Sequence, residues 1–376
     1  MEKNKFFPEV MGNFAFGCMR LPMNGEEVDY EEFTKMADAF TEAGFNYFDT
    51  AHGYINGKSE IAIRECVAKR YDRSKFLLTN KLTETFFKTE EEIRPFFEQQ
   101  LEWCGVDYFD FYLMHAQNKE NYKQYQRCHA YEVASQLKKE GKIRHLGISF
   151  HDKAEVLDMI LTDHPEVEVV QIQFNYLDYE DETVESRKVY EVCEKHQKPV
   201  LVMEPVKGGS LVNLPEKADG ILRELEGGSN ASYAIRFAAS FPQMAVILSG
   251  MSDMNQMQDN LSFMKDFTPL NDIEYDALAK VCGVMKGLDL IPCTSCKYCI
   301  EENECPKGIL IPEMFAAFNA KEAFHNTKGD VIHENALRHG HGKASDCIKC
   351  GKCEKVCPQH LEIRNLLVKV ANTFEV

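Results

Sequence analysis

Long apolar runs are missing from this 376-residue sequence, and positive charge is scarce. No segment approaches the roughly 20 apolar residues of a membrane-spanning helix. Residues 1–8 contain no apolar core of signal-peptide length, so we expect a cytoplasmic protein with no membrane partner. Lysine and arginine number 43 against 60 aspartates and glutamates, a formal net charge of −17. Because nucleic acids bind through a positive protein surface, we expect no nucleic acid as a partner either.

Short apolar segments with β-like composition alternate with amphipathic helical stretches between Phe14 and Ser249. Such alternation is typical of β/α units on a parallel sheet, and eight strands are the number of a TIM barrel. The predicted strands are 14–19, 45–49, 76–80, 110–115, 145–149, 169–174, 199–203 and 245–249. The predicted helices are 31–43, 60–69, 91–103, 125–139, 153–161, 183–196 and 231–240.

A doubly wound sheet is the alternative arrangement of such units. Its dinucleotide-binding fingerprint, G-x-G-x-x-G after the first strand, is missing, because residues 16–21 read FGCMRL. We therefore predict an α/β fold with a TIM (β/α)8 barrel over residues 1–287. Active sites of such barrels lie at the carboxyl ends of the strands.

Four polar residues meet at that predicted face. Asp49 ends the second strand and is followed by Tyr54, Lys81 follows the third strand, and His115 ends the fourth. Each residue alone is more often structural than catalytic, but the combination favours an active site. A carbonyl that accepts hydride develops alkoxide character and needs a proton donor, and a phenol with a pKa of about 10 is poorly matched to neutral pH. A neighbouring ammonium favours the phenolate, and a carboxylate keeps that ammonium charged.

The segments FDTAHGY at 48–54, TNK at 79–81 and LMH at 113–115 resemble the catalytic tetrad of the aldo-keto reductases. The resemblance covers the whole predicted barrel. It implies a TIM barrel that binds a nicotinamide cofactor across the strand ends and reduces a small carbonyl-like substrate. It also implies that Tyr54 is the general acid and that Lys81 lowers its pKa. Asp49 would pair with Lys81, and His115 would orient the substrate carbonyl.

The same resemblance places ten further residues around the cofactor. Positions after the fifth to seventh strands hold the nicotinamide amide and the pyrophosphate, and Met203 stands where family members commonly stack an aromatic ring. Members that prefer NADP carry a lysine and an arginine after the eighth strand, whereas this sequence has neither charge there, which favours NADH over NADPH. The ten residues are Ser149, Gln171, Met203, Lys207, Gly208, Gly209, Gly250, Gln256, Asp259 and Asn260.

Cysteine is concentrated near the other end of the sequence. Eight of the fourteen cysteines form two runs, each with three cysteines at x2 spacing followed by a Cys-Pro pair. This pattern is typical of two [4Fe–4S] clusters, in which the cysteine before proline reaches the other cluster. Structural zinc sites usually pair their cysteines, so zinc is the weaker alternative. We predict Cys293, Cys296, Cys299 and Cys357 as ligands of cluster one, and Cys347, Cys350, Cys353 and Cys305 as ligands of cluster two.

The two runs resemble those of two-cluster bacterial ferredoxins and of ferredoxin-like domains fused to redox enzymes. One departure is the spacing of five residues between Cys299 and Cys305, where the pattern has three. A helix-like stretch at 312–324 separates the runs. We therefore predict a small, mostly helical ferredoxin-like iron–sulfur domain over residues 288–376.

Hydride and single-electron chemistry would meet in such a protein. A nicotinamide passes two electrons at once and a [4Fe–4S] cluster passes one, so their coupling normally needs a flavin or a similar converter. FMN at the barrel mouth, with its phosphate on the loop of Gly208 and Gly209, is therefore an alternative cofactor.

We predict an oxidoreductase that reduces a small carbonyl-like substrate and is coupled to electron transfer through the two clusters. A ferredoxin or a flavoprotein would then be its electron partner. One alternative is an NAD(P)H-dependent carbonyl reductase with structural or redox-sensing clusters, and another is an FMN-containing iron–sulfur reductase. A non-enzymatic electron carrier on a barrel scaffold is the third, and the combination of Tyr54 and Lys81 speaks against it.

Overall fold

The computed structural model describes residues 3–225, 227–301, 305–325 and 327–375. The chain divides into two compact units. The barrel unit comprises Met1–Pro205 and Ala234–Leu270, and the C-terminal unit comprises Val206–Tyr233 and Asn271–Val376. The segment Val206–Tyr233 thus packs with the C-terminal residues, although it precedes the predicted domain boundary at 287/288. That boundary stays a prediction.

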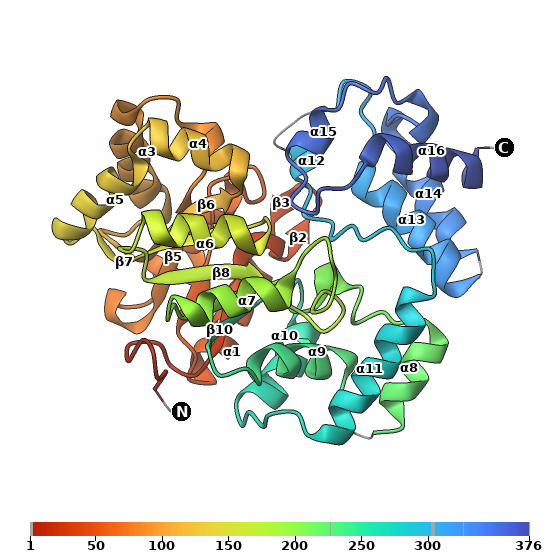
Figure 1. The fold of residues 1–376 in the computed structure, drawn as a ribbon, viewed down its shortest axis with the longest axis horizontal. Coiled ribbons are helices and arrows are strands. Elements are labelled where there is room, and N and C mark those ends of the chain that lie inside the picture. The colour runs from red at the N-terminus through yellow and green to blue at the C-terminus, as the bar shows by residue number, and fades with distance from the viewer. Residues whose placement is uncertain (1–2, 226, 302–304, 326, 376) are drawn as a thin grey trace. The chain divides into compact units, whose positions relative to one another are not determined.

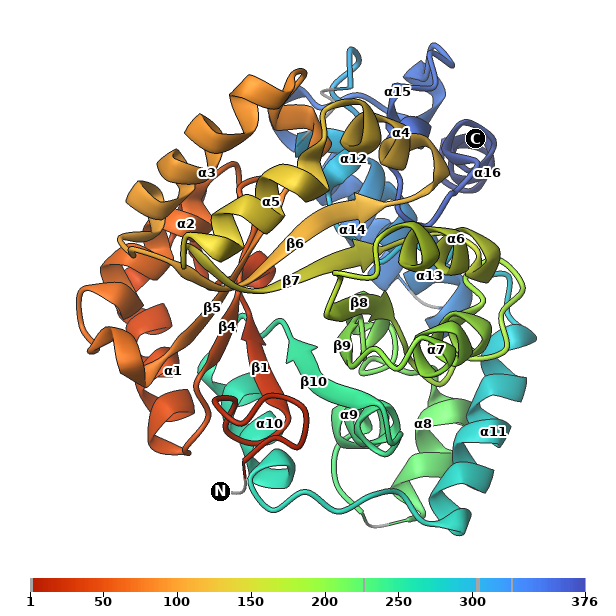
Figure 2. The same ribbon diagram turned by 60° about the vertical axis from the view of Figure 1, so that its left-hand side comes forward.

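A closed barrel of eight parallel strands forms the core of the barrel unit (Figure 1). The strand order is β1-β10-β9-β8-β7-β6-β5-β4, and Figure 2 labels all eight strands. Phe16 of β1 pairs with Phe48 of β4 on one side and with Ser249 of β10 on the other, which closes the barrel. The eight strands overlap the eight predicted segments, and the predicted fold class is confirmed. The strands are β1 Phe14–Gly17, β4 Tyr47–Asp49, β5 Leu77–Leu82, β6 Phe109–Gln117, β7 Ile143–Phe150, β8 Val169–Gln173, β9 Val200–Met203 and β10 Met244–Ser249.

Helices surround these strands, as Figure 2 shows. The predicted helix at 125–139 is two helices, because His129 adopts a left-handed backbone conformation with φ 48° between them. The predicted helix at 60–69 continues beyond α2 as a π-helical turn, Arg64–Ala68. The helices are α1 Tyr30–Glu42, α2 Lys58–Ile63, α3 Glu90–Cys104, α4 Lys119–Arg127, α5 Ala130–Lys139, α6 Ala154–Asp163, α7 Ser186–Lys195, α9 Asn230–Ala239 and α10 Met254–Met264, and a two-stranded hairpin pairs β2 Met23–Asn24 with β3 Glu27–Val28.

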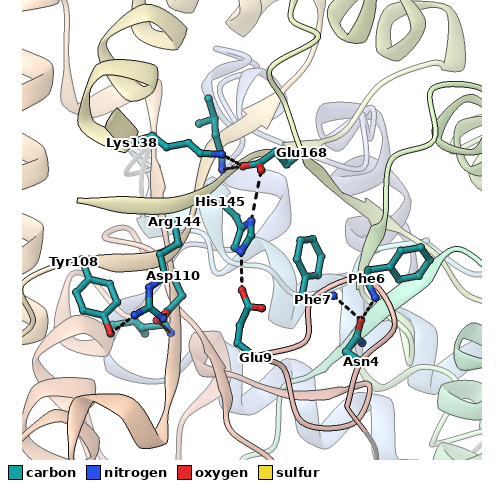
Figure 3. A network of polar contacts seen from close by, with 12 residues as sticks. Asn4, Phe6, Phe7, Glu9, Tyr108, Asp110, Lys138, Arg144, His145 and Glu168 are labelled. Carbon is teal, nitrogen blue, oxygen red and sulfur yellow. Dashed lines mark hydrogen bonds and ion pairs between the residues drawn. The ribbon is translucent and has the colours of Figure 1, made fainter. Parts of the chain in front are cut away.

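The amino-terminal segment packs at the amino ends of the barrel strands, where Phe7 and Val10 join the buried cluster of Tyr47, Leu77 and Phe111. Figure 3 shows Phe7 and Glu9 with His145. Phe7 is buried and packs edge-on against Phe111 of β6, with ring centroids 5.0 Å apart. Glu9 Oε1 lies 2.6 Å from His145 Nε2, and Glu168 Oε1 lies 3.7 Å from the other nitrogen of the same ring. Because side chains occupy this end, the carboxyl ends of the strands are the place for a site.

The C-terminal unit is helical, and its described residues contain no β-strand. Met314 and Phe318 of α13 pack with Leu367 and Val370 of α16 in one apolar core, which also includes Cys299 and Cys353. The helix predicted at 312–324 is α13. The helices of this unit are α8 Glu216–Arg223, α11 Asp272–Lys286, α12 Tyr298–Glu301, α13 Ile311–Phe324, α14 Lys328–Ala336, α15 Lys352–Lys355 and α16 Ile363–Phe374.

Within the described ranges, none of the helices has both the length and the apolar character needed to cross a membrane.

Candidate active site and cluster-binding loops

The predicted tetrad comes together at the carboxyl ends of β4, β5 and β6. Asp49 is the last residue of β4 and pairs with Thr79, so Lys81 lies two residues further along β5. Lys81 Nζ donates to Asp49 Oδ1 at 2.7 Å and to the Tyr54 hydroxyl at 3.1 Å. A third hydrogen bond, of 2.9 Å, joins the ammonium to the carbonyl oxygen of Thr50. The Lys81 ammonium therefore donates all three of these hydrogen bonds to the end of β4 and to the loop that follows it.

Burial and charge act against each other in this pair. Lys81 has no exposed surface, and burial opposes its charged form. The Asp49 carboxylate and the Tyr54 oxygen outweigh that effect and raise the pKa of Lys81 above its usual value. Burial raises the pKa of Asp49, and the nearby ammonium opposes that rise. A charged ammonium thus stands beside the Tyr54 oxygen, as phenolate stabilisation requires.

His115 lies near Tyr54, with the two ring centroids 6.1 Å apart and the ring planes nearly perpendicular. Its Nδ1 is 2.7 Å from the hydroxyl oxygen of Thr83, a residue that the sequence reasoning missed. Burial, the Lys81 charge and His151 lower the pKa of His115 well below its usual value. The imidazole is therefore neutral at pH 7. Thr83 is two residues beyond Lys81, so strand alternation offered a signal for it.

Two of the predicted cofactor residues extend this site within the barrel unit. Ser149 and Gln171 pair across β7 and β8. The Ser149 hydroxyl accepts a 2.9 Å hydrogen bond from the Ala116 N–H, next to His115. Gln171 Nε2 donates to Asp49 Oδ2 at 3.3 Å. Both side chains are buried, so they connect the tetrad to the neighbouring strand ends.

The other predicted residues of the barrel unit lie at β9, β10 and α10. Met203 ends β9 and is partly exposed, and Asp259 lies on α10. Asn260 Oδ1 accepts from the Ser249 hydroxyl at 2.7 Å. Gln256 Oε1 accepts from the Ser252 N–H at 2.9 Å. These two bonds tie the turn after β10 to α10.

A cation that the sequence reasoning missed lies against this turn. A β-carbon placed on Gly250 would lie 3.4 Å from Cδ of Arg20, which follows β1. The Ser252 hydroxyl also donates to the Arg20 carbonyl oxygen at 2.8 Å. The loop after the eighth barrel strand has no lysine or arginine of its own, but Arg20, from the turn after the first strand, lies beside it.

The remaining predicted cofactor residues, Lys207, Gly208 and Gly209, belong to the C-terminal unit. All three have positive φ, at 47°, 63° and 96°. A β-carbon on Gly208 would overlap the backbone of Thr294, 2.7 Å from its carbonyl carbon, whereas nothing lies within 4 Å of one on Gly209. The turn after β9 therefore touches the first cysteine run.

The four cysteines predicted for cluster one line one cavity of this unit. Thr294, Ile311 and Phe315 contribute to its walls. Burial and the neighbouring cysteines raise the pKa of Cys299, which is mostly inaccessible to solvent. A thiolate at this position needs compensation by positive charge, which bound iron supplies. The cysteines in this cavity are Cys293, Cys296, Cys299 and Cys357.

Both cysteine loops share one backbone pattern that suits an anionic cluster. Ser295 and Lys297 have φ of 52° and 67°, and the equivalent Lys349 and Gly351 have φ of 58° and 73°. Left-handed residues at alternate positions turn successive N–H groups into a concavity that binds anions, as in many Fe–S sites. One such group, the N–H of Ser295, donates to Cys293 Sγ at 3.4 Å.

The cysteines predicted for cluster two lie beside the same apolar core. Cys353 is in that core, and Cys347 and Cys305 pack against it. The neighbouring Cys353 thiol contributes to the raised pKa of Cys299, so the two predicted ligand sets adjoin. In the described part of the chain, no three His, Cys, Asp or Glu side chains are arranged to hold a single metal ion. Residues 302–304, within the irregular spacing before Cys305, lie outside the described residues.

Comparisons with known protein families agree with both units. Residues 13–282 match the Aldo/keto reductase family, and residues 292–361 match the 4Fe-4S dicluster domain.

Several curated relatives are oxidoreductases. The uncharacterized oxidoreductase YqkF of Bacillus subtilis is 24% identical over 66% of this chain and 85% of its own length. Human aldo-keto reductase family 1 member C3 is 31% identical, and the match covers 35% of this chain and 44% of that protein. The NADH-specific methylglyoxal reductase of Escherichia coli is 25% identical over 45% of this chain and 54% of its length. The chain thus spans less than half the length of the human relative.

Solved structures share the barrel fold. The holo form of aldo-keto reductase AKR11C1 from Bacillus halodurans superposes with a TM-score of 0.60 at 22% identity, covering 75% of this chain and 96% of that one. A Klebsiella pneumoniae aldo/keto reductase in complex with NADP and acetate gives a TM-score of 0.61 at 18% identity, covering 75% and 95%. The chain belongs to the aldo/keto reductase family, and it carries a 4Fe-4S dicluster domain after its barrel.

Proposed function

We propose that this protein reduces a small carbonyl-like substrate, with Tyr54 as the general acid, and exchanges electrons with an outside carrier through two [4Fe–4S] clusters. One observation carries the barrel half of this proposal. The buried Lys81 ammonium contacts the Asp49 carboxylate and the Tyr54 hydroxyl at the same time. A phenol in hydrogen-bonding contact with a buried ion pair is better suited to a proton-donating role than to a purely structural one.

The proton step follows from these contacts. As a substrate carbonyl gains negative charge, the Tyr54 hydroxyl gives its proton to the carbonyl oxygen. Lys81, 3.1 Å away, stabilises the phenolate that remains. Asp49 keeps the ammonium charged and in place. The neutral imidazole of His115 orients the carbonyl by hydrogen bonding without competing for the proton of Tyr54.

A nicotinamide cofactor, when bound, supplies the hydride. Ser149 and Gln171 would hold its amide, and their closeness to Asp49 and Ala116 supports that role. The backbone of Lys207, Gly208 and Gly209 would meet the pyrophosphate, because a turn of left-handed residues presents N–H groups. Met203 would face the nicotinamide ring, and Gly250, Gln256, Asp259 and Asn260 would surround the adenosine.

NADH remains the favoured form, since the turn after β10 has no cation of its own, and the Escherichia coli relative is named NADH-specific. Arg20 is the competing observation, because its side chain lies against Gly250. The Klebsiella pneumoniae structure contains NADP. The choice between NADH and NADPH can be tested with wild type and Arg20→Gln. The affinity of each protein for each cofactor is measured by the quenching of Tyr and Trp103 fluorescence. A selective loss of NADPH affinity in the variant would assign Arg20 to the 2′-phosphate.

Cys293, Cys296, Cys299 and Cys357 would hold cluster one, and Cys347, Cys350, Cys353 and Cys305 would hold cluster two. The thiol-lined cavity and the shared loop conformation support this assignment. The closeness of Cys299 and Cys353 supports one-electron transfer between the clusters. FMN is the alternative cofactor in the barrel, as a converter between one and two electrons.

The decisive experiment is anaerobic purification with iron, sulfide and flavin analysis of one sample, followed by visible spectra during turnover with NADH and a small aldehyde. We expect about eight irons per chain, two cubes of four. Cluster absorbance that changes during turnover supports the proposed coupling. A fixed cluster spectrum with active carbonyl reduction would instead favour structural or redox-sensing clusters.

A further inference from the structure

The two cysteine runs differ in charge. From Cys293 to Cys305, the only cation is Lys297, against three glutamates. From Cys347 to Cys357, the three lysines Lys349, Lys352 and Lys355 stand against the single Glu354. The second run is thus a positive segment in a chain whose net charge is −17. This asymmetry gives the two predicted clusters different surroundings.

The positive run is also the more accessible of the two. Cys350 is exposed, and the other thirteen cysteines are buried or partly buried. Ile348 beside it is 56% exposed. Lys349, Lys352 and Lys355 are exposed as well. An edge of cluster two would therefore lie at the surface, next to one apolar residue and three lysines.

The one acidic residue of the run is neutralised within the unit. Glu354 forms an ion pair of 2.8 Å with Arg364 of α16. The guanidinium of Arg364 lies against the loop, because its Cζ would be 3.7 Å from a β-carbon on Gly351. With Glu354 paired in this way, the three lysines give the segment 347–357 an excess of positive charge.

We propose that the segment 347–357 is the docking surface for an acidic one-electron carrier protein. Lys349, Lys352 and Lys355 contact carboxylates of the carrier, and electrons pass at the edge held by Cys350. In each encounter the reduced carrier loses one electron and cluster two gains it. The proposal rests on the proposed electron exchange through the clusters and adds its entry point and its partner.

The chemistry of such encounters agrees with this surface. Electron-transfer complexes are small and short-lived, and complementary charge raises their association rate rather than their lifetime. A few exposed lysines around a cluster edge, with one apolar contact at Ile348, match that type of interface. The rest of the acidic chain repels an acidic carrier, so the positive segment also selects where the carrier binds.

The test uses the anaerobic holoenzyme and stopped-flow reduction of its clusters by a reduced, acidic plant-type [2Fe–2S] ferredoxin. The variant is Lys349→Gln/Lys352→Gln/Lys355→Gln. The control is Lys217→Gln/Lys280→Gln/Lys286→Gln, which removes the same charge from three exposed lysines of the same unit. Photoreduced deazaflavin serves as a small reductant, and iron content shows that clusters are assembled.

We expect the ferredoxin rate to fall about tenfold in the first variant and to change little in the control. The wild-type rate should also fall as salt rises, and a ferredoxin with amidated carboxylates should react slowly with the unaltered enzyme. Deazaflavin should reduce all three proteins at one rate.

Equal ferredoxin rates in both variants, or faster reduction by a basic carrier protein of equally low reduction potential, would overturn the docking surface alone. Clusters that neither ferredoxin nor deazaflavin reduces would overturn the proposed electron exchange and the docking surface together.

Discussion

Gly208 lies in backbone contact with Thr294. A β-carbon on Gly208 would stand 2.7 Å from the Thr294 carbonyl carbon and 2.8 Å from its Cα, well inside normal contact distance. Gly208 is in the turn proposed to meet the pyrophosphate, and Thr294 lies between Cys293 and Cys296, proposed ligands of cluster one. A residue of the proposed dinucleotide site therefore packs against the loop that carries proposed ligands of cluster one.

Replacement of Gly208 by alanine should disturb cluster one. Gly208 and Gly209 both have left-handed φ, 63° and 96°, so alanine costs about 1 kcal/mol of backbone strain at either position. Only at Gly208 does the new methyl group meet a neighbour. We expect Gly208→Ala to lose iron and part of the cluster EPR signal, and Gly209→Ala to keep both. Equal iron content and spectra in the two variants would contradict the contact.

Tyr54→Phe should abolish carbonyl reduction. The variant keeps the ring but removes the hydroxyl that Lys81 contacts at 3.1 Å, and loss of a general acid costs at least about 100-fold in turnover number. Cofactor affinity and iron content should stay unchanged.

Tyr71→Phe is the matched control, because its hydroxyl contacts Asp38 and Thr41 instead. Steady-state kinetics with NADH and a small aldehyde measure both variants. An unaffected turnover number in Tyr54→Phe would reject the acid role.

Lys81→Met should destabilise the barrel more than the simultaneous removal of the Lys81 and Asp49 charges. Removal of the ammonium leaves the Asp49 carboxylate buried without its cation, at a cost of about 3–5 kcal/mol. The double variant Asp49→Asn/Lys81→Met has no buried charge and should recover much of that loss. Thermal unfolding is followed through Trp103, the single tryptophan, on α3 of the barrel unit. If the double variant is less stable than Lys81→Met, the unpaired Asp49 charge is not the cause of the lost stability.

His115 should make the barrel less stable as pH falls. Its folded pKa is well below the ordinary value, whereas in the unfolded chain the imidazole titrates at about 6.5. Below that pH the unfolded state binds a proton that the folded state does not bind. The free energy of unfolding therefore decreases by about 1.4 kcal/mol for each unit by which the pH falls.

Unfolding by urea at pH 7.5 and 5.5, read from Trp103, measures this loss. Between the two pH values, His115→Gln should lose about 1.4 kcal/mol less stability than wild type, because glutamine at position 115 does not titrate in this pH range. Identical losses in both proteins would show that His115 takes up its proton at the same pH in the folded and the unfolded chain.

Local sequence patterns predicted much of this fold. Each barrel strand is a short apolar run between turn residues, which composition alone reveals, and the start of the helix at 312–324 is marked by Pro312. The break between α4 and α5 escaped prediction, because His129 takes a left-handed conformation without the glycine that usually marks one.

The site shows the same division. Asp49, Tyr54, Lys81 and His115 could be named as candidates because polar residues that follow successive barrel strands meet at one face. Thr83 was missed although strand alternation offered a signal for it. Arg20 could not be named, because its importance depends on its contact with Gly250 across the barrel.

The sequence by itself determined the eight strands, the tetrad and the eight cysteines, since these depend on residue type and short-range spacing. Tertiary structure alone decided that Val206–Tyr233 joins the C-terminal unit and that Gly208 touches Thr294. It also decided that Lys81 reaches Asp49 and Tyr54 together and that Cys350 is the exposed cysteine. These relationships join residues far apart in the chain, and their distances follow from the packing of whole strands and helices rather than from any local pattern.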